Sequence, residues 1–128
     1  MQNIDEFNRL TLEILGRLYE EFPNEIFISV NEFYEDSQAT SHLDTFAGTI
    51  EFLRREGYLI YESGTDEGVM FSGMQLTMRG LSLLERVPDS VSDGKSVGKK
   101  ITDLVRSGMK TVGKEAITET VKMLFSAS

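Results

Sequence analysis

Residues 57–86 constrain the fold of this chain more than any other stretch, because two short apolar segments in it flank a glycine-bounded turn. The stretch reads GYLIYESGTDEGVMFSGMQLTMRGLSLLER. Residues 58–61 and 69–76 have the length and composition of strands, and the polar cluster at 63–68 favours a β-hairpin between them. Thr77 then has the position of an N-cap for a helix. The sequence therefore predicts a hairpin followed directly by a capped helix.

Helical signals precede the hairpin. Residues 4–22 carry apolar side chains at three- and four-residue steps, which predicts an amphipathic helix that ends at Pro23-Asn24. The members of this stripe are Ile4, Phe7, Leu10, Ile14, Leu15, Leu18 and Phe22. Residues 26–28 could add a third, short strand. Ser29 and Glu32 have the spacing of a capping box, which predicts a short second helix.

A third helix is expected before the hairpin, after a turn over residues 36–40. Ser41 with Asp44 gives its start signal, weaker than the first because Asp replaces Glu or Gln. Its inward stripe is Leu43, Phe46, Ala47, Ile50 and Leu53. Gly57 follows as a left-handed C-cap residue. Phe52 lies off the stripe, so we expect it either to be exposed or to receive the tail helix.

The chain divides into three parts by composition. Residues 1–87 hold the periodic segments, residues 88–96 are a small, polar, glycine-bearing linker, and residues 97–125 form an amphipathic tail. Ser107-Gly108 and Gly113 interrupt the tail pattern, so we expect two short helices, near 97–107 and 111–125, or one bent helix.

Charge is distributed unevenly along the chain, whose net charge is −8. Residues 1–87 contain six basic and sixteen acidic groups, a net charge of −10, whereas residues 88–128 contain seven and five, a net charge of +2. All six lysines lie in the second part. An acidic body keeps a protein in solution. The alternative is that the basic tail meets an acidic surface, either its own or a partner's.

The residue types give no support for catalysis. The chain has no cysteine and one histidine, so a thiolate metal site is impossible and a serine nucleophile lacks an obvious base. The glycine-rich cluster at 63–68 has no lysine and no following helix, unlike a phosphate loop. We therefore expect no enzyme activity, cofactor, metal or small-molecule ligand. The acidic start and the short apolar runs predict neither a signal peptide nor a membrane span, and so a cytoplasmic protein.

The end of the hairpin and the helix after it contain Leu76-Thr77, Gly80 and Leu83-Leu84. With the order of elements over residues 4–87, these residues resemble the winged helix-turn-helix superfamily of bacterial regulators. The resemblance implies an α+β, mostly helical fold with a two- or three-stranded antiparallel wing sheet, here followed by a C-terminal helical tail. The layout is also similar to a family of small, uncharacterised bacterial winged-helix proteins with such a tail, which implies no activity.

In DNA-binding members of the superfamily, the third helix enters the major groove and the wing tip touches the backbone. The resemblance then implies a recognition surface of Ser41, His42, Thr45, Thr49, Arg55 and, at the wing tip, Thr65. His42 could serve there as a base-edge donor or a pH-sensitive group, or be incidental. DNA binding needs positive charge. The third helix carries three carboxylates against two arginines, and the wing tip carries Asp66 and Glu67 without a cation, which disfavours DNA.

The tail leaves two alternatives open. It folds back onto its own body, or it joins two subunits through Val105, Met109, Val112 and Ala116. We favour the second, a homo-oligomer and most simply a dimer, and expect residues 1–87 to fold as a monomer without the tail. The sequence thus predicts a non-enzymatic, self-associating winged-helix module that binds protein. The alternative is a DNA-binding transcriptional regulator.

Overall fold

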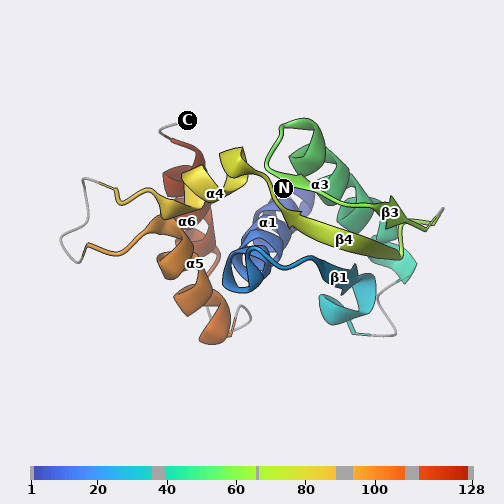
Figure 1. Ribbon diagram of the computed structural model, residues 1–128. Coiled ribbons are helices and arrows are strands. Elements are labelled where there is room, and N and C mark those ends of the chain that lie inside the picture. The colour runs from blue at the N-terminus through green and yellow to red at the C-terminus, as the bar shows by residue number, and fades with distance from the viewer. Residues whose placement is uncertain (1, 36–39, 66, 89–93, 109–112, 127–128) are drawn as a thin grey trace.

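Helix α1 (Gln2–Glu21) runs between two groups of elements in the computed structural model (Figure 1). The structure describes residues 2–35, 40–65, 67–88, 94–108 and 113–126. On one side α1 contacts α3 (Leu43–Arg55) and a small antiparallel sheet. On the other side it contacts α5 (Val97–Arg106) and α6 (Lys114–Phe125), and α4 (Met78–Glu85) packs against both of these tail helices. Within the described residues the fold is α+β, with five α-helices and four strands.

The sheet has β4 (Met70–Leu76) at its centre. β1 (Ile26–Ser29) pairs with one edge of β4, and β2 (Leu59–Ile60) and β3 (Ser63–Gly64) pair with the other, all antiparallel. The predicted hairpin and the predicted third strand are thus confirmed. The register between β1 and β4 shifts by one residue where Gly73 adopts a φ of 67°. A glycine in this conformation is typical of a β-bulge, which bends the strand.

The hairpin turn is shorter than the sequence predicted. Ser63 and Gly64, assigned above to the turn, are paired with Ser72 and Phe71 in the ladder. The hydroxyl oxygens of Ser63 and Ser72 lie 2.8 Å apart, and the Phe71 ring lies so close to Gly64 that an added Cβ would be 2.9 Å from it. Cross-strand contacts of this kind extend a ladder past residues that by composition favour a turn.

Three of the predicted helix boundaries are confirmed. Ser29 and Glu32 form the capping box, although the segment that follows is a single 3-10 turn, η1 (Val30–Glu32). Gly57 has a φ of 87°, and its backbone N–H donates to the Arg54 carbonyl, as in a Schellman motif. The Thr77 hydroxyl accepts a hydrogen bond from the Gly80 backbone N–H and caps α4.

The predicted start of α3 is wrong. Ser41 lies within a 3-10 turn, η2 (Thr40–His42), and α3 begins at Leu43 with His42 in the N-cap position. The His42 side chain makes no capping hydrogen bond, because its ring is held by residues of other elements, as described below. Of the predicted turn at residues 36–40, residues 36–39 lie outside the described residues, and Thr40 begins η2.

Helix α1 is buried on two faces rather than one. The predicted stripe faces the sheet and α3, except that Ile4 is 49% exposed at the edge of the core. A second face is closed by the tail: an added Cβ at Gly16 would lie 3.1 Å from Ile101, and one at Gly98 would lie 2.7 Å from the Tyr19 ring. Leu12 is fully buried as well. The two glycines therefore let α1 and α5 approach closely.

The hydrophobic core crosses the predicted boundary at residue 88. Val97, Ile101 and Leu124 are fully buried in the same cluster as Leu10 and Phe46. The tail forms two helices, as expected for a pattern broken by Gly108 and Gly113. Helices α5 and α6 therefore complete the core of this chain.

Candidate interaction surface

Four of the five exposed residues of α3 are spaced by three or four positions, and we call them the α3 surface: Asp44, Gly48, Phe52 and Arg55, with Arg54 outside this set. At 3.6 residues per turn these positions lie within about 80° of one another around the helix. The Phe52 side chain is 42% exposed, and its ring packs edge-on against Phe7 of α1 at 5.5 Å. Phe52 therefore does not receive a tail helix: it joins α3 to α1 and keeps part of its ring in solvent.

The predicted recognition face of α3 is rotated relative to the α3 surface. Thr49 is only 3% exposed, so its assignment to a groove-facing position is wrong in this structure. The Thr49 hydroxyl donates to the Thr45 carbonyl at 2.7 Å, which satisfies a polar group inside an apolar stripe. Thr45 is itself half-buried. Thr49 shares the buried face with Phe46 and Leu53, which lie three and four residues away.

His42 is held within the protein. Its Nδ1 lies 3.0 Å from a Glu6 carboxylate oxygen, and its ring stacks on Tyr34 with centroids 4.4 Å apart. The Tyr34 hydroxyl donates to the same carboxylate oxygen at 2.9 Å. Burial raises the pKa of Tyr34, and the Glu6 carboxylate raises it further because the phenol donates to it. Ser41, the neighbouring predicted site residue, is exposed.

The predicted wing-tip residue builds the turn. The Thr65 hydroxyl accepts hydrogen bonds from the backbone N–H groups of Val69 and Met70 at 2.9 and 3.3 Å. Its backbone N–H also donates to the Met70 carbonyl. These bonds fix the loop between β3 and β4, so the hydroxyl already has partners.

The two arginines at the end of α3 differ in their surroundings. Arg54 forms an ion pair with Glu51 at 3.0 Å, and Glu51 also accepts a hydrogen bond from the Tyr61 hydroxyl. The bonds from Arg54 and Tyr61 lower the pKa of Glu51. Arg55 is exposed and attracts Glu51 electrostatically, but within the described part of the chain neither Arg55 nor Asp44 forms an ion pair or side-chain hydrogen bond.

The four residues predicted to join two subunits have different positions. Val105 is half-buried, and its side chain lies 3.7 Å from a Cβ built on Gly16 of its own chain. Ala116 is exposed in the first turn of α6. Met109 and Val112 lie outside the described residues. That these residues form an oligomer interface stays a prediction.

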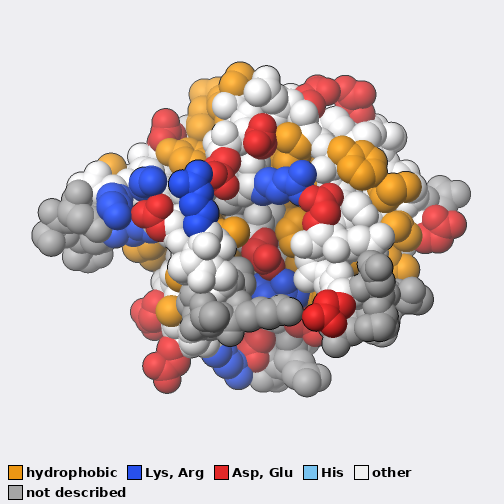
Figure 2. Space-filling view, turned by 90° about the horizontal axis from the view of Figure 1, so that it is seen from below, with side chains coloured by type: hydrophobic (Ala, Val, Ile, Leu, Met, Phe, Trp, Pro, Cys, Tyr) orange, Lys and Arg blue, Asp and Glu red, His pale blue; other side chains and the backbone are white. Residues whose placement is uncertain are grey.

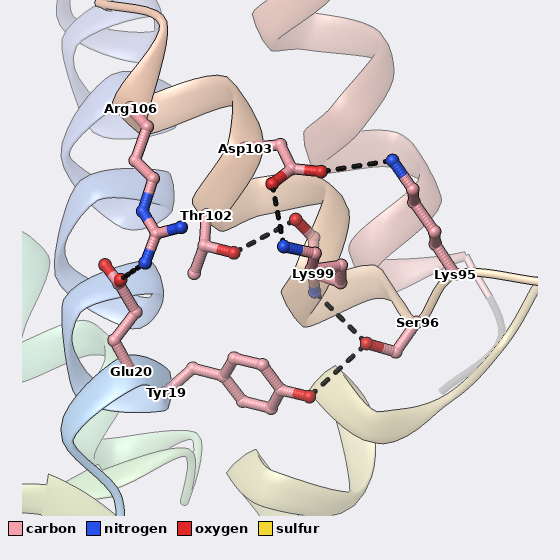
Figure 3. Close-up of polar contacts among 8 residues, drawn as sticks. All are labelled: Tyr19, Glu20, Lys95, Ser96, Lys99, Thr102, Asp103 and Arg106. Carbon is pink, nitrogen blue, oxygen red and sulfur yellow. Dashed lines mark hydrogen bonds and ion pairs between the residues drawn. The ribbon is translucent and has the colours of Figure 1, made fainter.

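Several basic side chains of the tail form ion pairs with carboxylates of their own chain. Figure 3 shows Lys95 and Lys99 against Asp103, at 3.3 and 3.2 Å, and Arg106 against Glu20 of α1. In the view of Figure 2, the lysine and arginine side chains lie mainly toward the side of α5 and α6. Asp103 is itself part of the tail, so only the Arg106–Glu20 pair here joins the tail to an acidic group of its own body, one of the two alternatives left open by the sequence.

A groove of about 270 Å³ lies between α1 and α6, lined by Asp5, Glu6, Asn8, Arg9, Lys114, Ile117 and Thr118. An ion pair of 2.9 Å between Lys114 and Asp5 joins the two helices there. Within the described residues no group of three or more histidine and carboxylate side chains is placed to hold a metal ion. In the same part of the chain, none of the helices combines the length and the apolar character that crossing a bilayer requires.

Comparisons of the chain with known protein families, with curated proteins and with solved structures give no match.

Proposed function

We propose that this chain is a non-enzymatic winged helix-turn-helix module that binds protein through the α3 surface. The order of elements supports the winged-helix assignment: α1, β1, the 3-10 turns η1 and η2 in the place of a second helix, α3, the hairpin of β2 and β3 with β4, then α4. The strand order β1-β4-β2 supports it too, because the last strand of a winged domain pairs with both others. In this assignment α3 is the recognition helix and the hairpin is the wing.

The proposal rests on three of the six residues expected to contact DNA, whose side chains are buried or already bonded within the protein. Thr49 is buried, His42 is bound by Glu6, and the Thr65 hydroxyl is used by its own turn. The α3 surface offers an aromatic ring between one acidic and one basic group, and the Glu51–Arg54 ion pair lies beside it. Aromatic residues and arginine are enriched where protein partners dock, whereas phosphate contacts need several cations.

The alternative, a DNA-binding regulator, needs cationic side chains beside α3. In one chain, α3 and the basic tail lie on opposite sides of α1 (Figure 1). Arg106 and Lys114 of the tail are also paired with Glu20 and Asp5 of α1. A positive face joining α3 to the tail would therefore have to come from a second subunit.

A titration of labelled random duplex DNA, followed by fluorescence anisotropy between 50 and 200 mM salt, separates the two functions. We expect no binding at micromolar protein concentration. Micromolar affinity that falls steeply with added salt would contradict the proposal, because that slope counts phosphate contacts. The control variant D44K/E56K/E67K replaces carboxylates of α3, its C-cap and the wing with lysines. It should gain salt-sensitive DNA binding, which would show that the assay detects a cationic surface at these positions.

A further inference from the structure

We propose that the partner of the α3 surface is a second copy of this chain. The two α3 helices pack antiparallel, and a twofold axis crosses them at the level of residue 50 along the helix. The inference rests on the proposed function and names the partner of that same surface. A twofold contact requires a self-complementary patch, in which each residue meets its counterpart across the axis. The α3 surface meets this requirement in shape and in charge.

Shape complementarity comes from Phe52 and Gly48. These positions are equidistant from residue 50, so an antiparallel pair places the half-exposed Phe52 ring of each chain over Gly48 of the other. A Cβ added at Gly48 would meet nothing within 4 Å, whereas one at Gly80 would lie 2.1 Å from the Tyr58 carbonyl oxygen. Among the described residues nothing packs on Gly48, although glycine inside a helix is unfavourable. The open space above it can admit a partner's ring.

Charge complementarity comes from Asp44 and Arg55. Eleven residues separate them, about 16 Å along the helix axis, so they cannot pair within one helix. Within the described residues neither has an ion pair. The same antiparallel register places each Asp44 opposite position 56 of the partner, one residue from the partner's Arg55, so the two side chains can meet. Two equivalent pairs then flank the central Phe52–Gly48 contacts.

One helix face is a small interface, so the association is weak and transient. Each chain carries a net charge of −8, and the mutual repulsion is screened over about 8 Å at 0.15 M salt. The association is therefore measured at that ionic strength and at high micromolar concentration.

Sedimentation equilibrium of the full-length chain and its charge-reversal variants tests the inference. D44R has a net charge of −8 + 2 = −6, and R55D has −8 − 2 = −10. Each variant alone places like charges at both pairs, so each should sediment as a monomer. An equimolar mixture restores opposite charges at both pairs and should form a heterodimer as readily as the wild type self-associates. General attraction cannot explain this result, since both variants are strongly negative.

Two further variants locate the contact, with circular dichroism as the check on folding. F52A should abolish self-association, and A116E, on the exposed start of α6, should leave it unchanged. A mixture that remains monomeric, or dimers lost in A116E but kept in F52A, would overturn the inference. A wild-type chain that is monomeric at high micromolar concentration would also overturn it. A monomeric wild-type chain would contradict self-association but not the proposed protein-docking function. Salt-sensitive DNA binding would contradict the proposed function.

Discussion

Two helical glycines, Gly80 and Gly48, have opposite surroundings and therefore opposite predicted responses to the same substitution. A Cβ at Gly80 would lie 2.1 Å from the Tyr58 carbonyl oxygen, so G80A must push α4 away from the hairpin. We expect a loss of about 2 kcal/mol in the free energy of unfolding, typical of overpacking.

The matched variant is G48A, whose added Cβ has no neighbour within 4 Å. It should raise the free energy of unfolding by about 1 kcal/mol, through helix propensity alone. Urea denaturation at low micromolar concentration, where a weak dimer is not populated, measures both variants. Equal effects of the two substitutions would show that the close approach at Gly80 is absent in solution.

The buried hydroxyl of Thr11 is a polar group whose removal should stabilise the protein. Its side chain is fully buried in α1, and its hydroxyl finds no hydrogen-bond partner in the described part of the chain. Replacing it with the isosteric valine removes an unsatisfied polar group and should stabilise the protein by about 1 kcal/mol. T49V removes a hydroxyl that is hydrogen-bonded to Thr45, and should instead destabilise it. Urea denaturation of both variants checks the contrast, and destabilisation by T11V would refute it.

Local signals in the sequence predicted individual caps better than individual contacts. Ser29, Gly57 and Thr77 act within a few residues of themselves, so spacing alone predicts them. The burial of Thr49 could not be predicted in the same way. A hydroxyl that bonds to a carbonyl one turn earlier satisfies itself inside a core, and polarity then no longer reports exposure.

At the scale of elements, Glu51 connects α3 to the hairpin and makes that connection dependent on pH. Its pKa is lower in the folded protein than the value of about 4.3 expected in the unfolded chain. The unfolded chain therefore binds more protons near that pH. The stabilisation from Glu51 is present above about pH 4.3 and is lost as the pH falls.

The variant E51Q removes this contribution. Because the Glu51 side chain is 38% exposed, the loss in the free energy of unfolding at pH 7 should be below about 1 kcal/mol. The difference from wild type should vanish toward pH 3 in a urea series. E119Q, at a side chain that is 74% exposed, is the control and should show no such trend. A constant difference at all pH values would exclude the linkage.

The packing of the tail helices argues against the prediction that residues 1–87 fold without them. Residues 1–87 were expected to fold alone, yet α5 and α6 cover the second face of α1 and bury Val97, Ile101 and Leu124. Each large apolar side chain contributes about 1.5–3 kcal/mol, against a total stability of about 5–15 kcal/mol for a domain.

Truncation after Pro88 should therefore leave residues 1–88 marginal or unfolded. Near-ultraviolet circular dichroism and urea denaturation would show the loss of fixed packing and of a cooperative transition. A truncated chain with a wild-type urea midpoint would instead support the independent domain that the sequence predicted.

The second face of α1 explains why the sequence could not predict this arrangement. That face contains Asn8, Gly16 and Tyr19 beside Leu12, so it has no apolar stripe for periodicity to detect. Its partner, α5, is close because Gly16 and Gly98 lack side chains, and a glycine's spatial neighbours are not encoded by spacing. The separate segments were predictable, whereas the side on which the tail packs depends on contacts between distant residues.

In the whole molecule, the tail helices belong to the core, and we propose that copies of the chain meet at the α3 surface. A dilution series of amide ¹H–¹⁵N spectra, from high to low micromolar concentration, tests both statements in one measurement. We expect concentration-dependent shifts at Asp44, Gly48, Phe52 and Arg55, with unchanged resonances over residues 97–106 and 114–125. Shifts confined to the tail, or spectra that do not change with concentration, would contradict this expectation.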